Sequence, residues 1–279
     1  MTEILQIVFK VSLLVFIVSS MMSMGLGLTI RQIAEPLKNV KLVVLSLIIN
    51  FLLVPLLVYG IISIIPLNEG ERIAMLLVAI AAGAPFIPKL ADIAKANIPF
   101  SMGLMLLLMV VTIFFMPIVV PYMLTGAEVS SWEIAKSLVI IMLLPLILAL
   151  LIRAYWEKGA KPMQGLFAKL TNIAMLLLII SLVILNTNHL IDKVGYPLLA
   201  ILLLLIGAMV IGYYLGGKEK DIRVVSALGA GQRNISAALL VGTQNFDNAD
   251  ITIMLVAVSI FGLFIMLPYA KRIGKSLTK

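Results

Sequence analysis

The sequence predicts an all-α integral membrane protein with nine transmembrane helices. Of its 279 residues, 62% are hydrophobic and 12% are charged, whereas about a quarter of the residues in a soluble domain carry charge. The mean hydropathy is +1.18, and apolar stretches long enough to cross roughly 30 Å of hydrocarbon as helices recur along the chain. The expected spans are 7–30, 39–65, 73–95, 98–124, 132–155, 166–188, 195–216, 222–244 and 251–270.

The first span, 7–30, is expected to be retained rather than cleaved as a signal peptide. Its start is acidic instead of basic, and its apolar stretch is too long for a signal sequence. The connections between spans are short, so we expect one transmembrane domain over residues 1–279 with no soluble domain. Since the chain has no cysteine, disulfides and thiolate metal sites are excluded.

The basic residues alternate between the two sides of the predicted bundle, although the net charge is +8. Only Arg72, Lys136 and Lys193 lie in connections on one side, while Lys10 lies near the outer start and Arg233 inside a span. The positive-inside rule therefore places the amino terminus outside and the carboxyl terminus in the cytoplasm, across the cell membrane. The basic residues are scattered over five short loops and do not gather on one face, which argues against a nucleic-acid partner. The other side carries Arg31, Lys38, Lys41, Lys89, Lys95, Arg153, Lys158, Lys161, Lys169, Lys218, Lys220, Arg223, Lys271, Arg272, Lys275 and Lys279.

An offset of 151 residues relates the two halves of the chain. It brings Asn97 onto Asn248 and Pro117 onto Pro268, and it pairs spans one to four with spans six to nine. Because five crossings separate the partners, the halves are expected to insert upside down relative to each other. Inverted repeats of this kind are typical of secondary transporters.

Each half carries one interrupted span. Gly83, Pro85 and Pro88 interrupt the third, and Gly229 and Gly231 interrupt the eighth. Proline removes a backbone donor and clashes with the preceding turn, while glycine lowers the steric cost of unwinding. We expect both helices to break in the membrane, where freed backbone groups indicate a binding site. The alternative is a pair of harmless kinks.

Arg233 lies beside the second interruption, inside an apolar stretch. A cation at the bilayer midplane costs from about 3 to more than 10 kcal/mol, so such residues mark functional sites unless a partner neutralises them. Guanidinium can anchor an anionic substrate through parallel hydrogen bonds to a carboxylate. The alternative is a structural charge satisfied by carbonyls at the helix break or by Asp92.

Four further polar residues are candidates for substrate binding. Gln232, Asn234 and Ser236 lie at or just after the second break, where they could cap unwound backbone or bind substrate. Asn50 lies in mid-span, where it could bind substrate or join two helices.

Lys89 and Asp92 follow the first break with a spacing that permits an ion pair on one helix face. A buried Asp92 would be a candidate for proton coupling, whereas a position at the cytoplasmic surface would leave both residues without function. The single histidine, His189, lies in a predicted outside loop and is expected to be solvated.

Four short motifs share their order and spacing with one known family. They are Met24-Gly25-Leu26; Asn50 five residues before Pro55; Ala84-Pro85 followed by Lys95-Ala96-Asn97 and Ser101; and Gly231 with Asn234, Ala237 and Ala238. On these motifs, nearly the whole chain resembles the bile acid:sodium symporter family, in its nine-span form.

This resemblance implies the bile acid symporter/NhaA-like fold, with two broken, crossing helices and a core that moves against a panel to give alternating access. The panel is expected to consist of the first span of the range of about 7–65 together with residues 132–188. The core is expected in about 39–124 and 195–270.

The chain departs from the family at the sodium sites. Where sodium-coupled members have a glutamate and a glutamine in the second crossing helix, this chain has Gly229 and Arg233. Their Ser-Asn pair in the first is also missing near Ile87-Pro88-Lys89. Two positive charges 4 Å apart repel by about 4 kcal/mol at an effective dielectric of 20. We therefore expect no sodium coupling there, with Arg233 either replacing the cation or binding substrate.

These observations predict a secondary active transporter of a small organic anion. The alternatives are a proton-coupled exporter similar to auxin efflux carriers, or a non-transporting membrane sensor. We expect no enzyme, because no hydrolytic or proteolytic motif is present. No cofactor or metal is expected. The expected partners are the lipid bilayer, the small anion and, for a proton-coupled transporter, protons.

Overall fold

The computed structural model describes residues 2–29, 31–32, 34, 38–123, 130–185 and 195–277, and all regular elements in these ranges are helices. The all-α prediction is thus confirmed. Lys193 and His189 lie outside the described residues. In chain order the elements are α1 (Thr2–Gly27), α3 (Val40–Ile48), the π-helical turn η1 (Ile49–Leu53), α4 (Val54–Ile64), α5 (Glu69–Ile80), α6 (Ile87–Ile93), α7 (Ile98–Met123), α8 (Ser131–Leu138), the π-helical turn η2 (Val139–Leu143), α9 (Leu144–Tyr155), α10 (Glu157–Leu185), α12 (Tyr196–Leu215), α13 (Lys220–Gly231), α14 (Ile235–Asn245) and α15 (Ala249–Leu277).

Eight helical segments of the described chain are long and apolar enough to cross a membrane. They match eight of the predicted spans, and the remaining predicted span, 73–95, forms the two short helices α5 and α6. Neither half is long enough to cross alone. The protein is therefore a multi-pass membrane protein, while the count of nine crossings stays a prediction.

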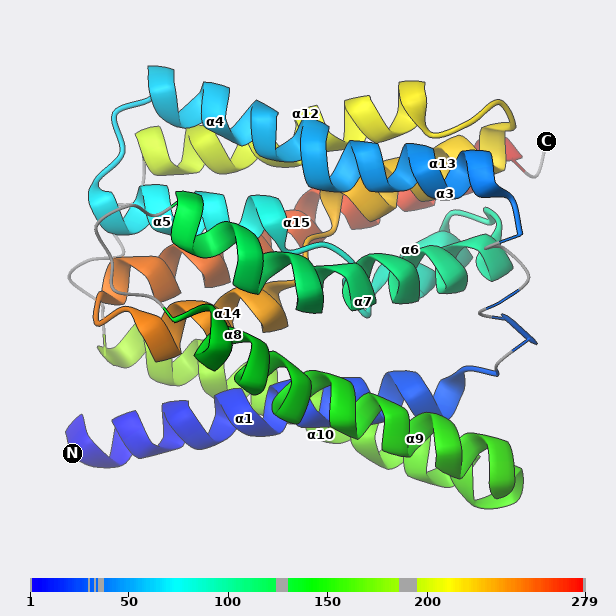
Figure 1. The fold of residues 1–279 in the computed structure, drawn as a ribbon, viewed down its shortest axis with the longest axis horizontal. Helices are drawn as coiled ribbons and strands as arrows, with labels where there is room; N and C mark the ends of the chain where they lie inside the picture. The colour runs from blue at the N-terminus through cyan, green and yellow to red at the C-terminus, as the bar shows by residue number, and fades with distance from the viewer. Residues whose placement is uncertain are drawn as a thin grey trace.

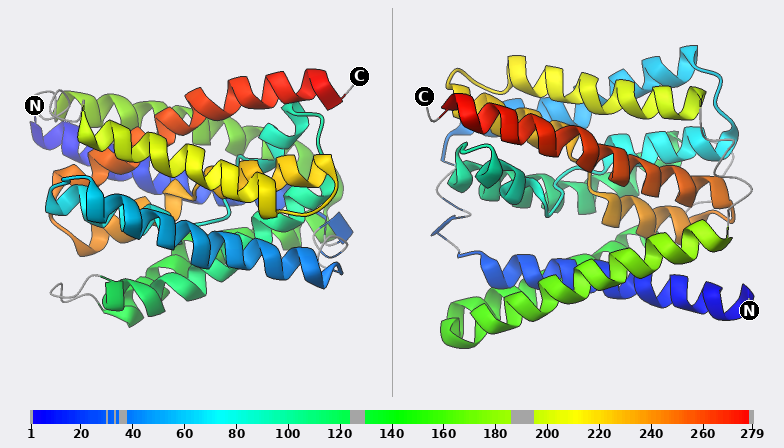
Figure 2. Two further views of the ribbon diagram at one scale, coloured as in Figure 1. Left: turned by 90° about the horizontal axis from the view of Figure 1, so that it is seen from above. Right: turned by 180° about the vertical axis from the view of Figure 1, so that it is seen from behind.

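The helices gather into two layers (Figure 1). Helices α1, α8, α9 and α10 form one layer, in which α1 packs along α9 and α10. The remaining helices form the thicker layer, and α8 joins the two by contacting α7 and α14. The view from behind in Figure 2 shows the same separation. The chain begins and ends at opposite ends of the molecule.

The element boundaries repeat with the predicted offset. Helices α5 and α13 each have 12 residues, and their first residues, Glu69 and Lys220, are 151 positions apart. The same separation relates Ile98 and Ala249, the first residues of α7 and α15. In Figure 1, α5 runs inward from one end of the molecule and α13 runs inward from the other. These helix starts thus repeat with the predicted offset, and α5 and α13 run in opposite directions.

Candidate functional site

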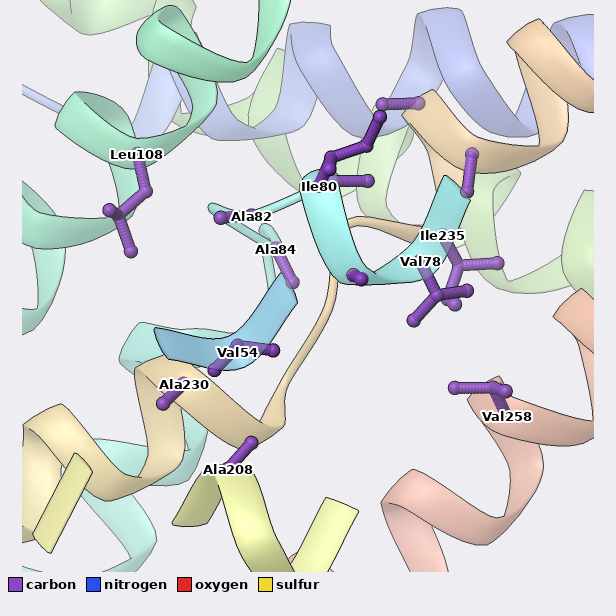
Figure 3. Close-up of a cluster of buried hydrophobic side chains, with 14 of the residues drawn as sticks. Val54, Val78, Ile80, Ala82, Ala84, Leu108, Ala208, Ala230, Ile235 and Val258 are labelled. Atoms are coloured by element: carbon purple, nitrogen blue, oxygen red, sulfur yellow. The ribbon is translucent and has the colours of Figure 1, made fainter. Parts of the chain in front are cut away.

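The two broken helices meet at their breaks. Residues 81–86 connect α5 to α6, and residues 232–234 connect α13 to α14. The backbone N–H of Asn234 donates to the carbonyl of Ala81 at 2.8 Å, and Asn234 Nδ2 donates to the carbonyl of Gly83 at 3.3 Å. Figure 3 shows the two extended linkers passing each other, with Ala82 and Ala84 on one of them. The predicted crossing of broken helices is confirmed.

Gly83 is required by the geometry of the first break. Its φ of +79° lies in the left-handed region, and a Cβ atom there would lie 2.2 Å from the backbone nitrogen of Met109. Pro85 lies in the following turn, and Pro88 lies in the first turn of α6, where its missing N–H has no intrahelical partner to lose. The predicted role of Gly83 and Pro85 in the break agrees with this geometry, while Pro88 starts the next helix.

Thr112 of α7 satisfies the backbone of the first break. Its Oγ1 accepts a hydrogen bond from the N–H of Ala82 at 2.9 Å and donates one to the carbonyl of the same residue at 3.0 Å. The side chain is fully buried. Sequence reasoning missed Thr112, although a hydroxyl in the middle of an apolar helix is a signal for such pairing.

The second break differs from the expected one. Gly229 and Gly231 lie within α13, and the helix stops at Gly231, so these glycines precede the break instead of forming it. The unwound residues are Gln232, Arg233 and Asn234. Asn234 is the N-cap of α14, because its Oδ1 accepts a hydrogen bond from the N–H of Ala237 at 3.1 Å. The break thus depends on a polar cap more than on glycine flexibility.

Arg233 is 2% exposed, and its guanidinium is enclosed by oxygen atoms. Nε donates to the carbonyl of Val78 at 3.1 Å. Nη1 donates to Asn50 Oδ1 at 2.8 Å and to the carbonyl of Ala230 at 3.2 Å. Nη2 donates to the carbonyl of Ala79 at 2.6 Å and to that of Asn50 at 3.5 Å. A guanidinium has five N–H groups, so these contacts use all of its donors.

The charge of Arg233 is stabilised by dipoles instead of by a carboxylate. Val78 and Ala79 lie at the carboxyl end of α5, and Ala230 lies at that of α13, where the helix macrodipole is negative. No ion pair joins Arg233 to a carboxylate within the described part of the chain. The predicted alternative of an Arg233–Asp92 pair is therefore wrong. The site carries one uncompensated positive charge.

Asn50 supplies two of these oxygens because it lies in the π-helical turn η1. In this wider turn the N–H of Val54 bonds to the carbonyl of Ile49, five residues earlier. The next N–H in that register would bond to Asn50, but residue 55 is proline and has none. The freed carbonyl faces Arg233, while Asn50 Nδ2 donates to the carbonyl of Ser46 at 3.0 Å and orients the amide.

The structure separates the remaining candidates into two groups. Gln232 and Ser236 are buried beside Arg233, at 8% and 3% exposure, and Gln232 Oε1 is buried without a hydrogen-bond partner among the described residues. Lys89 and Asp92 form the expected ion pair at 3.5 Å, but their side chains are 62% and 50% exposed. Asp92 therefore lacks the burial that its proposed proton-coupling role requires.

The seam between the two layers is closed at the crossing. It holds a cavity of about 10 Å³. A larger, open hollow of about 630 Å³ lies at one end of the molecule, where Asn68 and Glu71 already form the capping box of α5. The seam cavity reaches the second break, because Ile235, the first residue of α14, is part of its lining. The seam cavity is lined by Phe16, Met175, Leu178, Ile179, Ile235, Leu239, Val256 and Ser259.

Residues 13–193 match the family described as the Sodium Bile acid symporter family. This stretch extends from α1 to the residues before α12, and it includes Asn50 and the first break. Arg233 and the second break lie beyond it. No curated protein matches the chain.

Proposed function

Because this chain belongs to the sodium bile acid symporter family, we propose that it is a secondary active transporter of a small organic anion that does not use sodium at the family's sites. The family consists of transporters and not of enzymes. The proposals that the substrate is an anion and that sodium is not used depend on one observation, the guanidinium of Arg233 enclosed by oxygen atoms. Its geometry bears on both the coupling ion and the charge of the substrate.

Arg233 opposes sodium binding in two ways. It occupies the space at the crossing and uses the carbonyl and amide oxygens that a hard cation would need as ligands. Its uncompensated charge also repels a second cation by about 4 kcal/mol at 4 Å and an effective dielectric of 20, which corresponds to roughly a thousandfold loss of affinity. The arginine thus acts as a permanent, tethered cation.

The same charge favours an anionic substrate. Since no guanidinium donor remains free, Arg233 attracts the anion as a fixed charge and not as a direct ligand. The amino ends of α6 and α14 also begin at the crossing, and the positive ends of such half-helices favour anions. The seam next to α14 is mostly apolar, with Ser259 among its lining residues. Once the seam opens, this lining suits the apolar body of a small anion.

Alternating access follows if the two layers move against each other. We propose that α1, α8, α9 and α10 are the panel and that the thicker layer is the core, so that their movement opens the closed seam to either side. The opposite positions of the chain ends in Figure 1 support an odd number of crossings. We further propose nine crossings in the cell membrane, with the amino terminus outside.

The test begins with purified protein and a thermal-shift screen against carboxylates and sulfonates, with sodium or potassium and at two pH values. Hits are then followed by uptake into proteoliposomes. We expect uptake of a bound anion at equal rates in sodium and potassium buffers. Sodium-dependent uptake would refute the coupling proposal, and binding without uptake would favour the sensor. Outward transport driven by a proton gradient would favour the exporter.

The residue test uses two arginines. Arg233→Gln is expected to lower uptake at least tenfold, because the fixed charge is lost. Arg153→Gln is the matched control, since Arg153 lies in α9 and pairs with Glu157 at 2.9 Å, away from the crossing. Full uptake by Arg233→Gln would show that the buried charge does not act on the substrate.

A further inference from the structure

A second arginine, Arg223 of α13, is fixed in position while most of its donors stay unused. Its Nε donates to the carbonyl of Tyr213 at 2.8 Å. The guanidinium carbon lies 4.2 Å from the ring centroid of Tyr213 and 5.6 Å from that of Tyr214, and such cation–π contacts orient a guanidinium. Of its five N–H groups, the four on Nη1 and Nη2 have no partner within the described residues. Arg233, in contrast, uses all of its donors.

The acidic residues near Arg223 in the sequence do not neutralise it. Asp221 Oδ2 accepts a hydrogen bond from Asn97 Nδ2 at 3.2 Å, and Oδ1 accepts one from the N–H of Ile222 at 2.8 Å. Glu219 is exposed at the start of α13. In the part of the chain that the structure describes, no carboxylate forms an ion pair with Arg223. The planar fork of the guanidinium is therefore left for an anion from outside the fold.

Helix α15 brings further cations to this arginine. Lys220, one turn before Arg223 in α13, donates to Ser276 Oγ at 2.9 Å, which joins the start of α13 to the end of α15. The hydroxyl of Tyr269 lies within electrostatic range of Arg223. Tyr269, Arg272 and Ser276 follow one another at spacings of three and four, so they share one face of α15. The exposed Arg272 thus lies on the face that meets α13.

The junction of these three helices lies where a lipid headgroup is expected. The end of α12, the start of α13 and the end of α15 lie together at one end of the molecule (Figure 1). Tyrosine is enriched at membrane–water interfaces. An apolar stripe at helical spacing leads along α12 to Tyr214, whose ring adjoins Arg223. Its exposed members are Leu199, Leu203, Ile206 and Val210.

We propose that this junction binds the phosphate group of an anionic glycerophospholipid, whose acyl chain packs along the apolar stripe of α12. The cationic donors are Lys220, Arg223 and Arg272. A planar guanidinium suits phosphate because it can donate two parallel hydrogen bonds, and basic pockets between membrane helices bind anionic headgroups. Three positive charges disfavour a headgroup that carries its own ammonium. The site is separate from the crossing, so the proposal does not depend on the transported substrate.

The test is stabilisation of delipidated protein in detergent by lipids of different charge. Phosphatidylglycerol and phosphatidylcholine with the same acyl chains share the phosphate and differ in net charge. Inorganic phosphate has the charge but no acyl chain. We expect phosphatidylglycerol to raise the melting temperature, with half-maximal effect at a concentration about tenfold lower than for phosphatidylcholine. Inorganic phosphate at the same concentration should have little effect.

Variants of the junction separate a built site from general attraction to a basic surface. Arg223→Gln should abolish the preference for phosphatidylglycerol, and Arg223→Lys should keep only part of it, because an ammonium lacks the planar fork. Since both changes also remove the contacts with Tyr213, each shift is measured against the same variant without lipid. Arg272→Gln alters an exposed side chain, so it should weaken the preference without lowering the melting temperature of lipid-free protein. Lys169→Gln, at an exposed lysine of α10 in the other layer, is the control.

Equal stabilisation by the two lipids would overturn the proposal. A preference retained in Arg223→Gln, or lowered as much by Lys169→Gln, would also overturn it, because the attraction would then not depend on the junction. If Arg223→Gln does not fold, Arg272→Gln decides: an unchanged preference in that variant refutes the site. Stabilisation by inorganic phosphate as large as that by phosphatidylglycerol would show a site for free phosphate, and the lipid proposal would be wrong.

Discussion

Replacing Arg233 with alanine is expected to leave an oxygen-lined cavity that free guanidinium can refill. The change removes the hydrogen bonds to Val78, Ala79, Ala230 and Asn50. The two shortest, at 2.6 and 2.8 Å, are charge-assisted bonds of about 1.5–3 kcal/mol each. Desolvation of the charge offsets part of the total, so we expect a net loss of about 3–5 kcal/mol.

The assay is a melting curve of purified protein in detergent. One kcal/mol corresponds to about 2–4 °C in a chain of this size, so the apparent melting temperature should fall on the order of 10 °C. Guanidinium chloride at about 20 mM should restore at least half of this loss by binding the folded variant. Potassium chloride at equal concentration controls for ionic strength, and Arg153→Ala controls for the loss of an arginine elsewhere.

Either of two results would contradict this role of Arg233. A fall of less than about 2 °C would mean that the oxygen contacts of Arg233 do not stabilise the crossing of the broken helices. A large fall that guanidinium corrects no better than potassium would mean that the lost stability comes from packing of the side chain and not from its charge and donors.

Three further predictions concern the crossing. Asn50→Asp places a carboxylate at the atom that accepts from Arg233, so it should keep the fold, neutralise the site and weaken anion binding at least tenfold in the thermal-shift screen. Gly83→Ala places a Cβ atom against the backbone of α7 and requires a left-handed alanine, so gel filtration should show aggregated or no folded protein. The double variant Gly229→Glu/Arg233→Gln should gain sodium-dependent stabilisation, with potassium as the control, because it removes the tethered charge and adds a carboxylate. A Cβ atom at Gly229 would meet only the side chain of Leu104, whose Cδ2 would lie 2.9 Å away. A double variant that is folded but indifferent to sodium would separate Arg233 from ion selectivity.

The class of the protein and its repeat could be predicted because local composition carries them. A helix in hydrocarbon must be apolar over its whole length, so the spans are visible one by one. The breaks were equally visible, since Gly83 and Pro85 act on their own backbone. The boundaries of the second break were harder to predict. Gly229 and Gly231 remain helical, and the polar cap of Asn234 ends the unwound stretch.

The partners of Arg233 were beyond such reasoning. The sequence by itself established a buried cation in the eighth span, and it left open a cation substitute, a substrate anchor or a pair with Asp92. Only the tertiary structure excluded the pair with Asp92 and identified the partners of the guanidinium, because the oxygens come from Val78 and Asn50, which are 155 and 183 residues away. Hydropathy reports the surroundings of each segment, whereas a hydrogen bond depends on how segments cross. The same reason applies to the junction at Arg223, which forms only where α12, α13 and α15 meet.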